Sequence, residues 1–555
     1  MNCSATPYLS FSASELFMDN LSASRRGFLS RLGQATGAAG LLGLTGRASG
    51  QANAPIAGRD VYDVTAFGAR GDGKTLDTAA INRTIAEAAA AGGGTVAFPA
   101  GTFLSYSIQL KSNVGLHLGH GCVLLAAEGT GYDAAESNVP WESYQDYGHN
   151  HWHNSLIWGE QLHDVSISGP GLIWGKGLSR GEGLPPQAET PGVGNKSIAL
   201  KNCRNVLLRD FSILHGGHFG ILATGVDNLT IDSLRIDTNR DGMDIDCCRN
   251  VHVAHCSVNS PWDDAIVLKS SYALGFARST EMVTISDCLV TGGYQEGTLL
   301  DGTFRRFDDN RKLAPDEEAW RTGRIKFGTE SNGGFKNITV TNCVFDSCHG
   351  LALESMDGAQ VEDIVITNLT MREIYEAPIF IRLGSRMRGP TGAAVGTIRR
   401  LLISNVICSA APSPICSIIA GIPGHPVENV RLSNIVIEHK GGGTRDQAKI
   451  AVPEKEAAYP DPNMFGPMPA HGFFVRHLRG IEMEGIKVIA DGPDERPAFV
   501  LDNVENADFT RMQQPVTAGL PVFVLSDVRN FRLRDSANLP DVTLQSAAHE
   551  EILPK

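Results

Sequence analysis

The chain has 555 residues, of which 42% are hydrophobic, and it carries a formal net charge of −13. That length can build one very large core or several ordinary domains. The sequence has no apolar run of eighteen or more residues, which argues against a helical membrane span, and its acidic balance argues against nucleic-acid binding. We therefore expect a globular protein with neither membrane nor nucleic acid as a partner.

The first segment is typical of a twin-arginine export signal. Arg25 and Arg26 precede Phe28, a weakly apolar stretch of small residues follows, and an Ala-x-Ala ends at Ala54. We expect residues 1–54 to be this signal, cut near Ala54, which predicts a periplasmic or secreted protein. A disordered basic arm is the alternative. Loss of four basic and two acidic residues in this segment takes the charge of the mature chain from −13 to about −15.

A helix is predicted shortly after the signal. The segment "VYDVTAFGARGDG" favours one strand and a Gly-Asp turn, and Asp77 can then cap a helix in which Ile81, Ile85 and Ala89 recur every four residues. Glycines at 92–94 end this pattern. Such a helix can close the open end of a repetitive fold.

A short pattern then recurs along most of the chain. The segments "RNVLLRDFSI", "DNLTIDSLRI" and "RNVHVAHCSV" place Asn205, Asn228 and Asn250 at intervals of 23 and 22 residues, each before an alternating β-branched strand. This spacing predicts an all-β fold, a right-handed parallel β-helix (a solenoid) with an N-terminal capping helix. Leucine-rich repeats are the main alternative, but they need a leucine-dominated consensus that the chain lacks.

The repeat sets the expected organisation. We expect one β-helix domain over 55–540 and a tail over 541–555, with long loops near 126–160, 180–195, 292–322 and 440–475. Eleven cysteines in an exported protein would suggest disulfides. However, Cys256, Cys288 and Cys343 fall at the same phase of the repeat, which favours a column of buried free thiols.

Three carboxylates carry the first indication of chemistry. Asp241 in "TNRDGMDID" lies 22 residues, or one coil, before Asp263, and Asp264 follows directly. We expect the three to face one groove, where mutual repulsion leaves a protonated acid beside ionised bases. A Ca²⁺ site is the structural alternative, because hard oxygen ligands cluster in the same way.

Several motifs in order resemble glycoside hydrolase family 28, the polygalacturonases and their relatives. They are "VTAFGARGDGKTLDTAAIN", "NRDGMDID", "DDAIVLKSS" and "GTESNGG". The resemblance implies that Asp263 protonates the glycosidic oxygen while Asp241 and Asp264 activate a water on the opposite face. It also implies inversion of the anomeric centre, with carboxyl groups roughly 6.5–9.5 Å apart.

The sequence departs from the family at the substrate-binding motifs. Thr322 stands where the family has a histidine, and Ala352 and Glu354 stand where it has the arginine and lysine that grip a uronate carboxylate. A neutral sugar would suit Glu354 better, unless another cation compensates; "RIK" at 324–326 and the arginines of "IFIRLGSRMRG" could do so. Candidate substrate-binding residues are Lys269, Lys326, His349, Glu354 and Arg382.

We therefore expect an exported, monomeric glycoside hydrolase that acts on pectin-type polysaccharide or oligosaccharide and needs neither cofactor nor metal. Plain polygalacturonan is a less favoured substrate than side chains, chain ends or rhamnogalacturonan. A polysaccharide lyase of the same fold is the alternative enzyme, and it would need Ca²⁺ and a basic residue. A non-catalytic carbohydrate-binding β-helix is the alternative outside enzymes.

Overall fold

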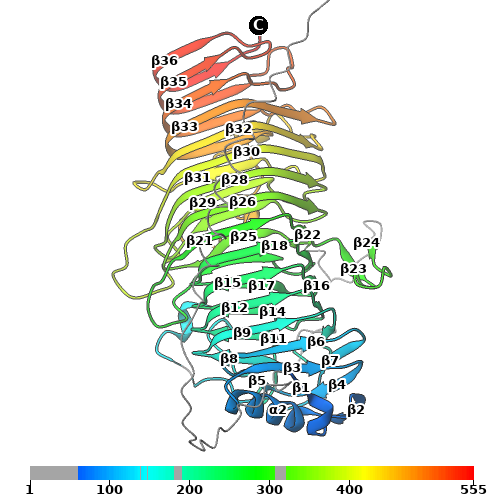
Figure 1. The fold of residues 1–555 in the computed structure, drawn as a ribbon. Helices are drawn as coiled ribbons and strands as arrows, with labels where there is room; N and C mark the ends of the chain where they lie inside the picture. Colours follow the sequence, from blue (N-terminus) through cyan, green and yellow to red (C-terminus); the bar gives the residue numbers. More distant parts are fainter. Residues whose placement is uncertain (1–60, 138, 147, 180–189, 307–320) are drawn as a thin grey trace, which may run out of the picture. The chain divides into compact units, whose positions relative to one another are not determined.

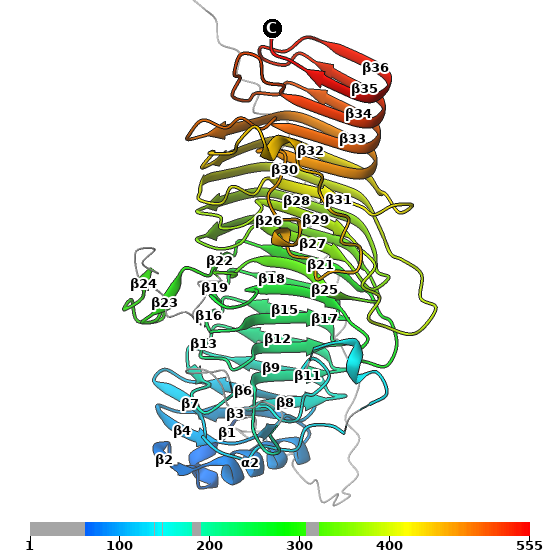
Figure 2. The same ribbon diagram turned by 180° about the vertical axis from the view of Figure 1, so that it is seen from behind.

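A computed structural model describes residues 61–555, except 138, 147, 180–189 and 307–320. The predicted export signal at 1–54 lies outside these residues. Within the described chain, parallel coils stack into one column, with a helix at one end and the last strands at the other (Figures 1 and 2). The right-handed parallel β-helix is confirmed. Among the described helices, not one combines the length and apolarity needed to cross a membrane.

The predicted capping helix is α2 (Thr78–Ala90), which buries Ile81 and Ile85. Asp77 occupies the N-cap position, but its side chain makes no cap hydrogen bond. Instead its carboxylate accepts the backbone N–H groups of Arg70 and Gly71, at 2.7 and 3.0 Å. Asp77 therefore stabilises the preceding Gly-Asp turn, next to the 3-10 turn η1 (Val64–Phe67).

Short parallel strands stack in three rows, one row for each side of a coil. The row that carries the candidate site consists of β5 (Ile108–Gln109), β8 (Ile157–Glu160), β11 (Lys196–Lys201), β14 (Phe219–Thr224), β17 (Asp241–Asp246), β20 (Ile266–Ser270), β25 (Ile325–Ser331), β27 (Leu351–Ser355), β29 (Ile379–Leu383) and β31 (Ser417–Ala420). The second row consists of β1 (Val61–Asp63), β3 (Gly94–Phe98), β6 (Val114–Leu118), β9 (His163–Ser168), β12 (Arg204–Arg209), β15 (Asp227–Asp232), β18 (Arg249–Ala254) and β21 (Thr280–Ser286). The third consists of β2 (Asp72–Leu76), β4 (Gly101–Ser105), β7 (Cys122–Ala126), β10 (Leu172–Trp174), β13 (Ser212–Leu214), β16 (Arg235–Asp237), β19 (Ser257–Asn259) and β22 (Leu289–Thr291).

Later coils merge two rows, or in β33 (Phe473–Ala490) all three, into single long strands. These are β26 (Phe335–Asp346), β28 (Gln360–Arg372), β30 (Thr397–Ala411), β32 (Val427–His439), β33, β34 (Phe499–Thr510) and β35 (Phe523–Arg534). Residues 541–555, expected as a tail, instead contribute β36 (Val542–Ile552), which pairs antiparallel with β35 and so covers the edge of the last coil. The hairpin β23 (Tyr294–Glu296) and β24 (Arg305–Arg306) projects from the column (Figure 1). The 3-10 turns η2 (Glu142–Tyr144), η3 (Gln447–Lys449) and η4 (Pro462–Phe465) lie in two of the long loops.

The repeated asparagines mark one corner of the coils. Asn205, Asn228 and Asn250 all have left-handed backbone angles, with φ near 56°. Their side-chain amides form a ladder, with N···O distances of 2.8 and 2.7 Å between successive coils. Asparagine tolerates this conformation better than most residues, so the repeat follows directly from the turn that it forms.

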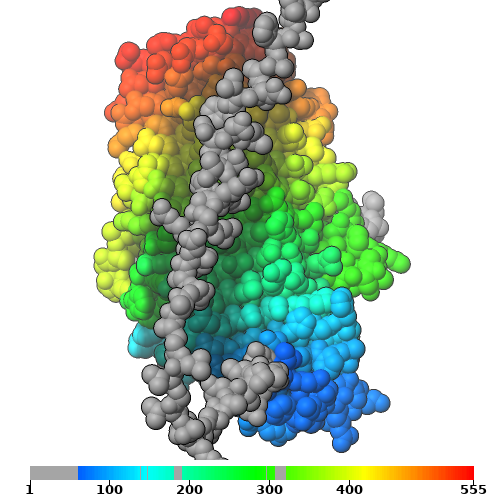
Figure 3. Space-filling view, in the orientation of Figure 1, coloured from blue at the N-terminus to red at the C-terminus, as the bar shows by residue number. Residues whose placement is uncertain are grey.

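The core fills the inside of the column and is apolar along its whole length. In Figure 3 the colours run from blue at one end of the column to red at the other, in the order of the sequence. The ten cysteines among the described residues are all buried and free, as the repeat phase predicts.

Candidate active site

The structure places Asp241 beside Asp263 and Asp264. Asp241 is the first residue of β17, and the aspartate pair lies in the turn before β20. The N–H of Gly242 donates to the carbonyl of Asp264 at 3.0 Å, so the two rungs are directly stacked. One side-chain oxygen from each of the three aspartates lies within 4.8 Å of the others. This spacing of nearest oxygens is closer than the roughly 6.5–9.5 Å that the resemblance implied for the carboxyl groups.

Asp264 is a buried carboxylate held by two cations. Nε of Arg324 donates to Oδ1 at 3.0 Å, and Nζ of Lys326 lies 3.3 Å from Oδ2. Burial opposes ionisation, but Lys326 and Arg324 outweigh it and lower the pKa of Asp264 below its ordinary value. Asp264 is therefore ionised at neutral pH.

Asp241 differs from Asp264 in that its pKa is raised, not lowered. It is buried, and its Oδ1 has no hydrogen-bond partner among the described residues. Burial and then the carboxylates of Asp244 and Asp263 raise the pKa of Asp241 well above its ordinary value. The cluster thus places a carboxyl group with a raised pKa beside one with a lowered pKa, and the sequence predicted such a raised pKa from charge repulsion.

Asp263 is the most open of the three, and its carboxylate forms an ion pair of 2.6 Å with Arg240. Their side chains are 24% and 30% exposed. Because an ion pair requires the carboxylate, Asp263 becomes a proton donor only after its contact with Arg240 loosens.

Lys269 and His149 lie on the far side of Asp244. Nζ of Lys269 is 2.8 Å from Glu330 and 3.8 Å from Asp244, so this lysine is neutralised by protein carboxylates. Nε2 of His149 is 3.5 Å from Asp244. Burial lowers the pKa of His149, but Asp244 and Glu330 outweigh burial and raise it above its ordinary value.

Glu354 is fully buried, with 0% of its surface exposed. Its Oε2 accepts from the hydroxyl of Thr329 at 3.2 Å and lies 3.8 Å from Nζ of Lys326. Burial raises the pKa of Glu354 to about 7, against the attraction of Lys326. Lys326 is in register with Ala352, so the "RIK" lysine supplies a cation one coil before the position where the family has one.

Arg382 and His349 were predicted to bind substrate, but each contacts other protein groups in the structure. Arg382 is completely buried, and its guanidinium donates to the backbone carbonyls of Gly421, Glu454 and Lys455. In this structure Arg382 therefore anchors the 440–475 loop. Nδ1 of His349 is 3.4 Å from Glu376, and Glu376 also accepts from Nη1 of Arg324 at 2.9 Å, so Glu376 and Arg324 connect His349 to Asp264.

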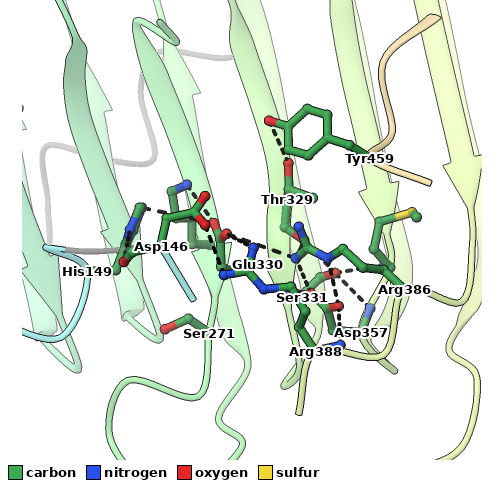
Figure 4. A network of polar contacts seen from close by, with 12 residues as sticks. Asp146, His149, Ser271, Thr329, Glu330, Ser331, Asp357, Arg386, Arg388 and Tyr459 are labelled. Atoms are coloured by element: carbon green, nitrogen blue, oxygen red, sulfur yellow. Dashed lines mark hydrogen bonds and ion pairs between the residues drawn. The ribbon is translucent and has the colours of Figure 1, made fainter. Parts of the chain in front are cut away.

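Sequence reasoning considered the arginines of "IFIRLGSRMRG" but missed Asp146 and His149, which a long loop brings to the site. Figure 4 shows Asp146 and His149 approaching Glu330 from one side, and Arg386 and Arg388 from the other. Arg388 contacts Asp146 at 2.9 Å across 242 residues of chain, and Nε of Arg386 donates to Asp357 at 3.0 Å. The arginines had a sequence signal in "RLGSRMRG", whereas loops carry no repeat from which to place Asp146 or His149.

The charges fit acid–base chemistry better than a bound Ca²⁺. The oxygens of Asp241, Asp263 and Asp264 are close enough to share an ion. However, Arg240 already neutralises Asp263, and the cations beside Asp264 would repel a second positive charge.

Sequence comparison finds two family models and several curated relatives. "Rhamnogalacturonase A/epimerase, pectate lyase-like" matches residues 61–140, and "Right handed beta helix region" matches 189–311. A probable polygalacturonase of Vitis vinifera is 25% identical, over 67% of this chain and 73% of its own length. An exo-poly-alpha-D-galacturonosidase of Dickeya chrysanthemi is 23% identical, over 58% of this chain and 57% of its own length.

Two solved structures have the same fold. The exopolygalacturonase of Thermotoga maritima superposes with a TM-score of 0.57 at 18% identity, over 78% of this chain and 92% of its own. The family 28 exopolygalacturonase of Yersinia enterocolitica gives a TM-score of 0.59 at 18% identity, over 80% and 78%. The chain is therefore similar in sequence to curated polygalacturonases, and it shares the right-handed parallel β-helix fold of the two solved exopolygalacturonases.

Proposed function

We propose that this protein is a pectin-degrading glycoside hydrolase that uses Asp241, Asp263 and Asp264. The observation that carries the proposal is the cluster of three carboxyl groups within 4.8 Å on adjacent rungs, in which the pKa of Asp241 is raised, that of Asp264 is lowered and Asp263 is the most exposed. Hydrolysis of a glycoside needs one acid to protonate the leaving oxygen and one base to activate water. The polygalacturonase homologues support the same chemistry.

In the proposed mechanism Asp264 is the base. Arg324 and Lys326 keep it ionised and fix its orientation, so it can take a proton from an attacking water. Asp263 lies nearest to solvent and is the proposed donor to the leaving oxygen, once substrate has displaced Arg240. The raised pKa of Asp241 favours its protonated form, which can donate a hydrogen bond to the same water or to the sugar. Inversion follows if water attacks from the face opposite the leaving group.

The proposed substrate is a pectic glycan. Glu354 no longer argues against a uronate there, because it is buried and lies against Lys326. Arg386 adds a donor: its Nη1 is buried and has no hydrogen-bond partner among the described residues. Lys326 and Arg386 are therefore the proposed substrate-facing cations, while Lys269 and Arg382 are already satisfied by protein groups.

The test is incubation with a panel of pectic fractions, followed by identification of the released sugars. New reducing ends without a rise in ultraviolet absorbance support hydrolysis, because elimination by a lyase would leave an absorbing double bond. Absence of any cleavage, together with retained binding, would favour the carbohydrate-binding alternative.

We also propose that the protein is exported through its twin-arginine segment and acts as a periplasmic or secreted monomer. The support is the pattern at Arg25 and Arg26 and the Ala-x-Ala that ends at Ala54. Replacement of both arginines by lysine should leave the protein in the cytoplasm, which fractionation of expressing cells would measure.

A further inference from the structure

One row of side chains points outward from the strands that carry the site. Register pairing runs unbroken from Trp158 through Ala199, Leu222, Asp244, Val267, Lys326, Ala352, Phe380, Ile418, Phe474 and Val500. Their sequence neighbours point into the core, because adjacent strand residues face opposite sides. The row is apolar at both ends and polar only around Asp244 and Lys326.

The N-terminal end of this row is covered by the loop that precedes β8. Trp152 packs on Ala199, Leu222 and Phe219, and it is only 2% exposed. The indole N–H of Trp152 donates to Thr224 at 3.1 Å. The same loop places His149 beside Asp244, so the loop covers the row as far as the edge of the catalytic cluster.

The C-terminal end is covered by the 440–475 loop. Val452, Phe465 and Met468 pack on the outward side chains of the row, including Phe380 and Phe474. Arg382 holds the backbone of this loop through the carbonyls of Glu454 and Lys455. Tyr459 of this loop reaches the site, where its hydroxyl lies 3.4 Å from Nζ of Lys326.

Between the two covers lies a short polar segment. From Leu222 to Ala352 the row advances by four coils, or roughly 19 Å at about 4.8 Å for each coil. Here Oδ1 of Asp241, Oε1 of Glu354 and Nη1 of Arg386 are buried and lack hydrogen-bond partners among the described residues. Buried polar atoms without protein partners indicate a place that water or a polar ligand fills.

We infer that the catalytic groove is closed at both ends and accepts the end of a glycan chain, not its interior. A polymer lying along the column would have to replace Trp152 on one side and the Phe465 cluster on the other. A chain end needs only the polar segment between them. Asp146 and Arg388 join the two walls beside Glu330, which narrows the entrance further. This inference rests on the proposed hydrolase function.

The first experiment compares product lengths and viscosity with a long pectic polymer. A chain-end enzyme releases only short sugars, and viscosity falls slowly while reducing ends accumulate. It also fails to cut a polymer whose two ends are chemically blocked. Early release of intermediate-length fragments, or cleavage of the blocked polymer, would overturn the inference while leaving the hydrolase proposal intact.

A binding measurement separates this inference from catalysis. With Asp263→Asn, titration calorimetry should give one bound protein for each chain end, whatever the polymer length. Stoichiometry that rises with polymer length would show interior binding. If no pectic fraction is cleaved by the wild type but end-specific binding is found, the hydrolase proposal fails and the closed groove stands.

A loop variant tests the cause. Replacement of 451–468 by a short Gly-Ser linker, combined with Trp152→Ala, removes Tyr459 together with the side chains that cover both ends of the row. We expect it to gain cleavage inside the end-blocked polymer at least tenfold over wild type. The matched control replaces the exposed segment 514–519, far from the site, and should behave as wild type. A folded loop variant that still acts only on ends would contradict the assigned role of this loop.

Discussion

The clearest test of the carboxylate roles is Asp263→Asn. If Asp263 donates the proton to the leaving oxygen, its loss should lower kcat about 10³-fold, within the 10²–10⁴ range for an acid–base residue and equal to about 4 kcal/mol of barrier. Stability should change by about 1 kcal/mol at most, because the Asp263–Arg240 pair is partly solvent-exposed. Reducing-sugar rates and thermal melts measure both quantities.

Asp264→Asn is the matched comparison, since it changes the neighbouring residue by the same atoms. It removes the carboxylate that Arg324 and Lys326 share, and breaking a buried pair typically costs about 3–5 kcal/mol. We therefore expect this variant to lose both activity and stability. Equal melting temperatures for the two variants would contradict the charge distribution described above.

A substrate with a good leaving group separates acid from base. A nitrophenyl glycoside needs little protonation, so Asp263→Asn should recover most of its activity on it, whereas Asp264→Asn should not. If Asp263→Asn keeps more than about a tenth of wild-type activity on the natural glycan, Asp263 is not the donor. If the nitrophenyl glycoside instead restores the activity of Asp241→Asn, the role of proton donor moves to Asp241, whose pKa is raised by burial.

Three further predictions follow from metal, pH and charge. Chelator should leave turnover unchanged, because the proposed mechanism needs no ion; loss of activity and rescue by Ca²⁺ would favour a lyase. Burial lowers the pKa of His439 to about 4 and that of His471 to about 3, so as the pH falls the unfolded state binds protons before the folded state does. The free energy of unfolding should therefore fall as the pH drops from about 6.5 towards 4. The melting temperature should fall with it, and His471→Gln should lessen that fall. Burial raises the pKa of Glu354 to about 7, so its contribution makes stability fall as pH rises from about 4.5 to 7, and Glu354→Gln should remove that part of the melting-temperature profile. An unchanged profile in either variant would refute the corresponding assignment.

The fold was predictable because the repeat is a direct product of backbone geometry. Asn205, Asn228 and Asn250 each occupy a left-handed turn and hydrogen-bond to the next coil, so the 22- to 23-residue interval in the sequence is the perimeter of one coil. The same interval placed Asp241 beside Asp263. The positions of residues within the regular coils can therefore be predicted from sequence spacing alone.

The loops were not predictable by this reasoning. His149 reaches Asp244 from a loop that leaves the column three coils earlier, and Tyr459 reaches Lys326 from a loop that leaves it several coils later. Neither the contact of His149 with Asp244 nor that of Tyr459 with Lys326 follows from sequence separation, because the length of a loop does not determine the direction in which it runs. The burial of Arg382 under such a loop also explains why a cation expected to face substrate is engaged with backbone carbonyls.

The substitution of Glu354 for a lysine illustrates how a solenoid can redistribute charge without changing its fold. Side chains at equivalent positions of successive coils are about 4.8 Å apart, which is within reach of one another's charge. Lys326 can therefore serve Asp264 on one neighbouring coil and Glu354 on the other. A cation moved by one coil remains in the same electrostatic environment, and the surrounding carboxyl groups adjust their protonation. Local motif loss in this fold is thus weak evidence against function until the adjacent coils have been examined.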